Sequence, residues 1–320
     1  MGLRKMLGKE KKTEFFFFSG KGGVGKTSMA AATALRFAKK GKKVLVISTD
    51  PAHSLADSFD KKIGGEVKKL DKNLYAVEID PKKAMAEYKA KLMPQIEKID
   101  MLKGVGLGDM FDMADSAPGI DEVAAFDKFL QYMNSNEYDI IIFDTAPTGH
   151  ALRFLSLPDV LDSWVGKMIK IRMKFSGMAN MIKRILPFGE SDDTPQLGTE
   201  QLDEMKKRIE QAKQLLSDPA RTHYNIVTIP EQMAILESDR CIQTLKEYNI
   251  PVETLIVNQL IPKNSRCVFC TEKRETQQKR LKEIESTFAK LEIKEMEMFK
   301  EEVRGTRMLE NVGKMLYAKS

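Results

Sequence analysis

The chain is poor in cysteine, with three cysteines among 320 residues. Only Cys267 and Cys270 lie close together, and an odd number of this kind does not make the disulfide framework of a small secreted domain. Disulfides are rare in reducing compartments, so this composition favours the cytoplasm as the place where the protein works.

Long apolar runs are also missing, and no stretch of the sequence is long enough to cross a bilayer. The basic N-terminus is not followed by a signal-peptide core, because the short run Phe15–Phe18 leads directly into a glycine-rich loop. The chain also lacks a large excess of either charge. Its 52 Lys and Arg and 46 Asp and Glu give a net charge of only +6, and the two signs are interleaved along the sequence. We therefore expect no nucleic-acid partner.

Short apolar and β-branched runs, separated by amphipathic helical stretches, recur along the chain. Such runs are typical of strands buried on both faces, and their alternation with helices predicts an α/β fold with a doubly wound, mostly parallel sheet. The predicted strands are Glu14–Ser19, Lys43–Thr49, Leu74–Ile79, Asp139–Asp144, Tyr224–Ile229, Thr254–Asn258 and Glu295–Phe299.

Two long segments, at about residues 82–136 and 158–216, interrupt this alternation. Both have a helical pattern and are rich in methionine, and only the strand and loop Asp139–His150 separates them. We therefore predict that residues 1–320 form a single domain carrying a helical subdomain built from two insertions. Methionines at this spacing also suit the subdomain's own core, so the pattern leaves open whether they form a binding surface.

A phosphate-binding loop follows the first predicted strand. Residues Gly20–Thr27, G-K-G-G-V-G-K-T, satisfy the P-loop pattern and open a predicted helix over Thr27–Lys40. Glycines let backbone N–H groups approach phosphate oxygens, while Lys26 is expected at the β- and γ-phosphates of ATP and the Thr27 hydroxyl at Mg²⁺. The residues predicted to bind the nucleotide here are Gly20, Lys21, Gly22, Gly23, Val24, Gly25, Lys26, Thr27 and Ser28.

Two carboxylates end predicted strands on the same side of the sheet. Asp50 follows the second strand, and Asp144 ends the hydrophobic run that begins at Ile140. In a doubly wound sheet both positions face the phosphate site, where one carboxylate orients the attacking water and the other holds Mg²⁺. Each aspartate taken alone is also compatible with a helix cap or a loop cap.

Lys21 distinguishes this loop from an ordinary P-loop. The sequence K-G-G-V-G-K-T resembles the loop of the deviant Walker A ATPases. In that group the extra lysine reaches across a dimer interface to the partner's nucleotide, where a cation stabilises the transition state as an arginine finger does. The resemblance implies a homodimer and a catalytic role for Lys21, alongside Lys26 and Asp50. A solvated loop lysine is the alternative.

Two further segments indicate which family of deviant Walker A ATPases this chain resembles. Ser48–Asp57, S-T-D-P-A-H-S-L-A-D, and Asp144–Leu155, D-T-A-P-T-G-H-A-L-R-F-L, are similar to switch I and switch II of the ArsA-type ATPases. That family contains arsenite-pump ATPases and the factors that target tail-anchored membrane proteins. The resemblance runs from about Phe15 to the C-terminus and implies that Asp50 polarises the attacking water and that Asn258 contacts adenine.

Cysteine positions separate the two branches of this family. The pump ATPases are typically two fused halves with a cysteine metalloid site, whereas this chain is one half and Pro118–Phe126 contains no cysteine. Soft As(III) or Sb(III) needs thiolates. Cys267 and Cys270 instead match the C-x-x-C of the targeting factors, which implies one Zn²⁺ held by four cysteines of two copies. A redox pair and two ordinary thiols remain alternatives; a thioredoxin-like motif would begin a helix after a first strand, whereas this one lies late, in a predicted loop.

The branch containing targeting factors implies a function for the methionine-rich insertions. Flexible thioethers suit a groove that accepts many apolar helices, here the transmembrane helices of tail-anchored proteins. The implied partners are a second copy, the client and a transient membrane receptor, with a tetramer around the client left open. An arsenite-pump subunit and a ParA/MinD-like positioning ATPase remain alternative functions. Cys241, in a predicted helix, is expected to be an ordinary buried residue.

Overall fold

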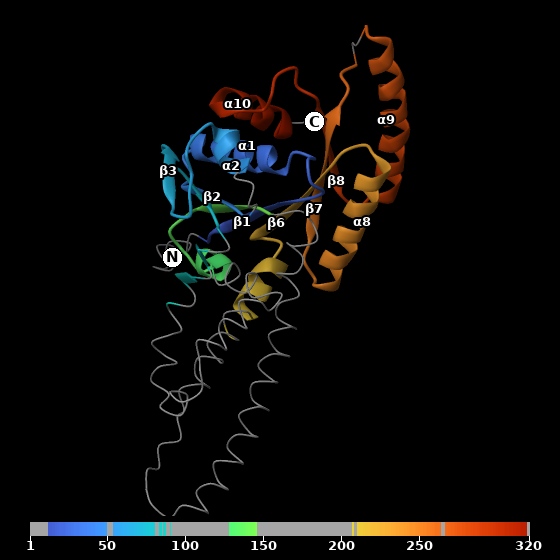
Figure 1. Ribbon diagram of the computed structural model, residues 1–320. Coiled ribbons are helices and arrows are strands. Elements are labelled where there is room, and N and C mark those ends of the chain that lie inside the picture. Colours follow the sequence, from blue (N-terminus) through green and yellow to red (C-terminus); the bar gives the residue numbers. More distant parts are fainter. Residues whose placement is uncertain are drawn as a thin grey trace, which may run out of the picture.

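The computed structural model describes residues 12–49, 54–80, 83–84, 86–87, 90, 128–145, 207, 210–263 and 266–318. In this part of the chain eight strands form one sheet in the order β3-β4-β2-β5-β1-β6-β7-β8 (Figure 1). Every pair of neighbouring strands is parallel except β3 and β4. The predicted α/β fold with a mostly parallel sheet is confirmed.

All seven predicted strands are present, and one was missed. The strands are β1 (Glu14–Ser19), β2 (Val44–Ser48), β3 (Lys68–Asp71), β4 (Leu74–Glu78), β5 (Ile140–Asp144), β6 (Thr222–Thr228), β7 (Val252–Leu260) and β8 (Glu292–Glu297). The missed strand, β3, is a short antiparallel edge with three exposed charged residues around Leu70, so it has no apolar run. The other edge strand, β8, starts three residues before its predicted start, since only Met296 of it is buried.

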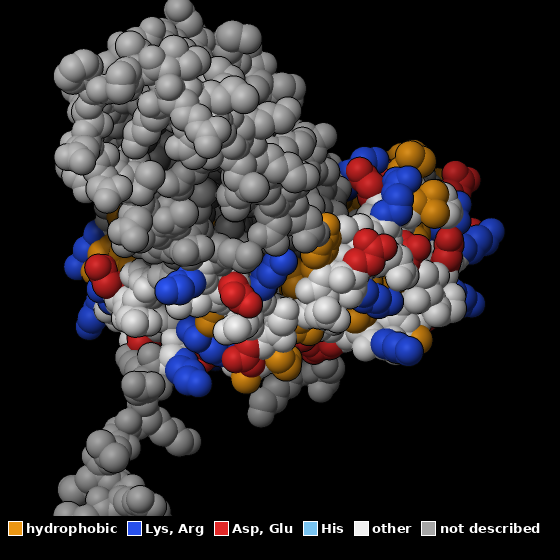
Figure 2. All heavy atoms as spheres, turned by 90° about the horizontal axis from the view of Figure 1, so that it is seen from below, with side chains coloured by type: hydrophobic (Ala, Val, Ile, Leu, Met, Phe, Trp, Pro, Cys, Tyr) orange, Lys and Arg blue, Asp and Glu red, His pale blue; other side chains and the backbone are white. Residues whose placement is uncertain are grey.

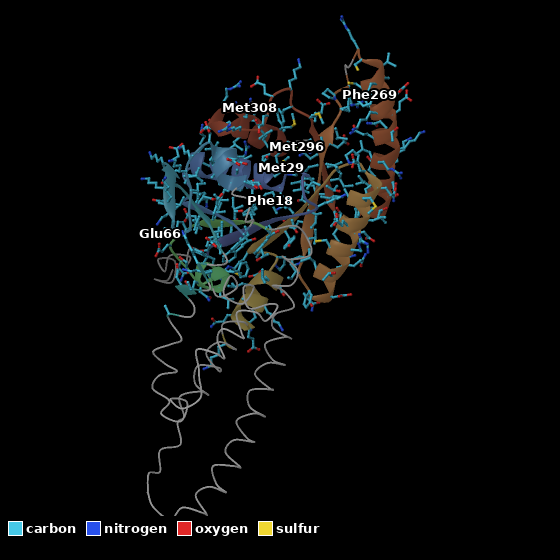
Figure 3. All side chains as sticks on the ribbon, in the orientation of Figure 1. Phe18, Met29, Glu66, Phe269, Met296 and Met308 are labelled. Carbon is cyan, nitrogen blue, oxygen red and sulfur yellow. The ribbon has the colours of Figure 1, made fainter. Side chains whose placement is uncertain are left out.

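Helices cover both faces of the sheet. On one face lie α1 (Lys26–Lys39), α2 (Ser54–Phe59) and α10 (Gly305–Leu316), which pack around a core that includes Phe18, Met29 and Met296 (Figure 3). The opposite core combines residues of α8 (Gln232–Glu247) and α9 (Val268–Thr287) with residues of the helical segments 128–133 and 210–217. This three-layer arrangement leaves the ends of the strands as the places where loops form a site.

Small residues set the spacing between α1 and α10. A side chain at Gly313 of α10 would place its Cβ 3.2 Å from the carbonyl oxygen of Ala32 in α1. The alanines of α1 present little volume to its neighbours, and Ala30, Ala31, Ala32 and Ala34 are all fully buried. The close packing fixes α1, the helix that begins at the phosphate-binding loop, firmly on the sheet.

The two predicted helical insertions are described only at their ends. Phe129, Leu130 and Met133 from the first, and Ala212 and Leu216 from the second, are buried in the same core cluster as α8. Met133 is therefore a core residue. The rest of both insertions lies outside the described residues, so the helical subdomain remains a prediction.

Charge is mixed over the described part of the surface, as Figure 2 shows for one face, where Lys and Arg side chains stand among Asp and Glu. No helix in the residues that the structure describes combines the length and the apolar character needed to span a bilayer.

Candidate nucleotide site

The candidate site lies at the carboxyl ends of three adjacent strands. β5 lies between β2 and β1, and the register pairs Asp144 of β5 with Ser48 of β2 on one side and with Phe18 of β1 on the other. The loop that follows β1 is the predicted P-loop. The sheet therefore brings the P-loop and the predicted Mg²⁺ carboxylate to one edge, as the motifs required.

Glycine is needed at specific places in the P-loop. A Cβ at Gly20 would lie 2.1 Å from the carbonyl oxygen of Val227 in β6, and Gly20 has φ +149°. Gly23 and Gly25 have φ +80° and +98°, a region that other residues rarely adopt. A Cβ at Gly22 or Gly23 would meet nothing within 4 Å, so the loop is tightly packed at Gly20 and open at its tip. The open tip is where the sequence predicts that the phosphates of ATP bind.

Lys26, the first residue of α1, is directed back into the loop. Its Nζ donates a hydrogen bond to the Lys21 carbonyl oxygen at 3.1 Å, and only 6% of the residue is exposed. Thr27 and Ser28 follow in the first helical turn and are partly buried. The N-terminus of α1 thus gathers backbone N–H groups, a cation and two hydroxyls where anionic phosphates and Mg²⁺ are expected.

Asp144 is fully buried at the end of β5. The Ser48 hydroxyl donates to its Oδ2 at 3.3 Å, and the Thr49 amide donates to its carbonyl oxygen at 3.1 Å. Thr145, the next residue, donates from its hydroxyl and its amide to the Phe18 carbonyl oxygen, at 2.9 and 3.2 Å. The strand ends are therefore bonded to one another. Asp50 lies outside the described residues.

β7 contributes two amide side chains that contact the P-loop. Asn258 Nδ2 donates to the Val24 carbonyl oxygen at 2.9 Å, and a Cβ at Gly25 would lie 2.5 Å from that nitrogen. Gln259 Nε2 donates to the Gly23 carbonyl oxygen at 3.1 Å. Asn258 thus lies beside the nucleotide site, and its adenine contact remains a prediction. Sequence reasoning missed Gln259, whose contact no motif signals.

The C-x-x-C lies at the start of a helix, so the prediction that it lies in a loop was wrong. Cys267 is the N-terminal cap of α9, its carbonyl oxygen accepts a 3.0 Å bond from the Thr271 amide, and Cys270 is in the first turn. A backbone hydrogen bond from Cys270, with one from its side chain, lowers the pKa of the exposed Cys267 thiol. Phe269, between them, is exposed at the tip of α9 (Figure 3).

The two thiols are half of a zinc site at most. Residues three apart on a helix share a face, so both sulfur atoms belong to one exposed end of α9. No group of three or more His, Cys, Asp or Glu that would hold a metal occurs within the described part of the chain. Because the chain has three cysteines and Cys241 is buried in α8, a site of four thiolates would require cysteines from a second copy.

Cys241 is the third cysteine, and it behaves as expected from the sequence. It lies in α8 with 1% of its surface exposed, and burial raises the pKa of its thiol to about 12. Because the thiolate is the reactive form, this burial disfavours reaction at Cys241. The prediction of an ordinary buried residue is confirmed.

Comparison with known proteins supports the same interpretation. A family model described as anion-transporting ATPase matches residues 13–318. ATPase GET3B of Arabidopsis thaliana is 38% identical over 328 aligned residues, which cover 96% of this chain and 79% of the relative. ATPase GET3C of the same plant is 40% identical, covering 95% and 82%, and ATPase GET3 of Podospora anserina is 39% identical, covering 96% and 91%. The chain belongs to the anion-transporting, ArsA-type family of P-loop ATPases and is an ATP-hydrolysing enzyme.

Proposed function

We propose that this ATPase captures the transmembrane helices of tail-anchored membrane proteins and delivers them to a membrane. The observation that carries the proposal is identity of 38–40% with ATPases named GET3, GET3B and GET3C over 95–96% of the chain. The switch segments and the C-x-x-C resemble the corresponding motifs of the factors that target tail-anchored proteins to membranes. We place the protein in the cytoplasm, working as a homodimer with a transient receptor at the membrane.

In this proposal ATP hydrolysis uses groups from both copies. Lys26 binds the β- and γ-phosphates, while the Thr27 hydroxyl and the Asp144 carboxylate hold Mg²⁺, whose charge offsets that of the phosphates. Asp50 polarises the attacking water. Lys21, which is partly exposed in the open loop, reaches the partner's nucleotide and stabilises the charge that develops in the transition state.

The strand ends offer a route from hydrolysis to release. Both switch segments continue directly from β2 and β5, whose ends are joined by the bond from Ser48 to Asp144. Loss of the γ-phosphate frees such segments in other P-loop proteins. We propose that ATP closes the dimer and joins the methionine-rich insertions into a groove, and that hydrolysis opens it and releases the client.

The client prediction is checked by co-expressing the chain with a tagged tail-anchored protein, followed by affinity capture and gel filtration. We expect a stable complex that is lost when the client's transmembrane helix is deleted. Asp50→Asn is expected to retain the complex while lowering ATP turnover about 100-fold or more, because the water loses its polarising base. Failure to capture the client with either form would contradict the proposal, and stimulation of ATP turnover by arsenite or antimonite would then favour a pump subunit.

Shared zinc gives a separate prediction. We expect the purified chain to hold one zinc ion per pair of copies, and Cys267→Ser with Cys270→Ser to remove the zinc and yield monomers without nucleotide, because half of a tetrahedral site binds poorly. Elemental analysis and gel filtration measure both effects. Cys241→Ala is the matched control, since this thiol is buried in α8. Zinc retained by the double variant would contradict the assignment.

A further inference from the structure

β7 contains a bulge at the point where it contacts the P-loop. Val257 pairs with Glu295 of β8 and Leu260 pairs with Glu297, so two residues of β7, Asn258 and Gln259, stand opposite one residue of β8. Gln259 has φ +62°, in the left-handed region that is costly for most residues. Bulges of this kind re-aim side chains. Here both amides of the bulge donate to the P-loop, at the Val24 and Gly23 carbonyl oxygens.

Gln277 of α9 holds the same bulge through its backbone. Its Nε2 donates to the Gln259 carbonyl oxygen at 3.1 Å, and its Oε1 accepts from the Ile261 amide at 2.9 Å. The Arg274 guanidinium adds a hydrogen bond to the Ile261 carbonyl oxygen. Gln277 is only 6% exposed; its bond to the Ile261 amide is buried and its bond to the Gln259 carbonyl is partly buried, which strengthens both relative to bonds in water.

Gln277 is also the first buried residue of α9. The helix begins at Val268, directly after Cys267, and its buried residues are Gln277, Leu281 and Ile284. The first two turns, which carry Cys270, therefore extend from the body of the protein without a buried side chain. The direction of the cysteine-bearing end consequently depends on how Gln277, together with the Arg274 bond to Ile261, is held.

These contacts form one path from the phosphate-binding loop to α9. The Gly23 carbonyl accepts from the Gln259 side chain, and the Gln259 carbonyl accepts from the Gln277 side chain. When phosphates bind the N–H groups of the loop, the peptide units that present the Gly23 and Val24 carbonyls are fixed with them. We infer that Gln277 is a positioning residue that couples nucleotide binding at the P-loop to the orientation of the cysteine-bearing end of α9.

The test uses thiol reactivity and needs neither zinc nor client. The metal-free chain, after chelation, is alkylated with iodoacetamide with and without Mg²⁺ and a non-hydrolysable ATP analogue, and mass spectrometry gives the rate at each cysteine. We expect nucleotide to change the rates at Cys267 and Cys270 about fivefold or more, the lower range of typical coupling between sites. Buried Cys241 is the internal reference and should stay unmodified.

Gln277→Leu removes both bonds to the bulge. It should still bind the nucleotide analogue, because Gln277 does not touch the P-loop, while the change in thiol reactivity falls below about twofold. Gln278→Leu, at the exposed neighbouring glutamine, is the matched control and should keep the full change. A nucleotide effect of normal size in Gln277→Leu, or no effect in the native chain, would overturn the inference.

A second variant covers the case in which Gln277→Leu does not fold. Gln259→Asn preserves the left-handed backbone, which asparagine tolerates, but its shorter side chain does not reach the Gly23 carbonyl oxygen. This substitution removes the contact between β7 and the P-loop. It should also reduce the effect of nucleotide on thiol reactivity to below about twofold. Persistence of the full effect would show that the path through the bulge carries no coupling.

Discussion

Gly20→Ala is expected to lower the melting temperature of the nucleotide-free protein by about 10 °C and to abolish ATP binding. The added Cβ would lie 2.1 Å from the Val227 carbonyl oxygen, which belongs to the backbone of β6 and has no side chain to move. Either β1 and β6 separate or the loop shifts, and φ +149° adds strain for any residue with a Cβ. Both adjustments distort the first turn of the phosphate-binding loop.

Gly22→Ala is the matched control. Gly22 lies two residues further in the same loop, has no positive φ, and its Cβ would meet nothing within 4 Å. Its melting temperature should stay within about 2 °C of the native value, as for other surface substitutions. Thermal unfolding followed by circular dichroism compares the two variants. Equal melting temperatures would show that β6 accommodates Gly20→Ala and that the packing argument is wrong.

Lys26→Ala is expected to lower the rate of ATP hydrolysis by about 1,000-fold at saturating nucleotide. Lys26 is the first residue of α1, and its ammonium group is already turned into the loop, 3.1 Å from the Lys21 carbonyl oxygen. Without it, the charge on the β- and γ-phosphates and the extra charge of the transition state lose a close cation. Truncating the side chain to alanine keeps α1 intact, because alanine favours helix.

The rate of phosphate release at saturating Mg²⁺ and ATP measures this loss. Lys42→Ala, at an exposed lysine beyond the far end of α1, removes the same charge from the chain and should hydrolyse ATP at the native rate. Thermal unfolding should be the same for both variants. A Lys26→Ala enzyme that retains a tenth of the native rate would mean that another cation performs this role.

Much of the fold follows from the sequence because parallel strands buried on two faces need continuous apolar runs. Ile140–Asp144 and Val44–Ser48 are fully buried and were found on that pattern alone. The P-loop was equally predictable, since its glycines and Lys26 meet demands that are local to one strand, one turn and one helix. Lys68–Asp71 was missed because an exposed edge strand has no such pattern.

Contacts between distant segments were not predictable. The hydrogen bonds from Gln259 to Gly23 and from Gln277 to Gln259 depend on a bulge in β7 and on the packing of α9. Neither of these features has a recognisable pattern in the local sequence. Cys267 was placed in a loop because proline and polar residues precede it, whereas the helix begins directly after it. The role of Asp50 and the methionine-rich groove concern residues that the structure does not describe, and they stay predictions.

The central position of β1 has a consequence during synthesis. β1 is the first strand in the described part of the chain, yet Thr145 beside β5 and Asn225 of β6, which bond to its Phe18 and Phe17 carbonyls, lie 127 and 208 residues away. At about 5–20 residues per second, the ribosome needs roughly 10 to 40 seconds to supply these partners. Until β5 is made, roughly 6 to 25 seconds after β1 at the same rate, the aromatic run Phe15–Phe18 lacks both of the strands that flank it in the sheet. We propose that this protein protects apolar segments of other newly made chains. During its own synthesis, its first apolar strand needs the same protection from water and from aggregation.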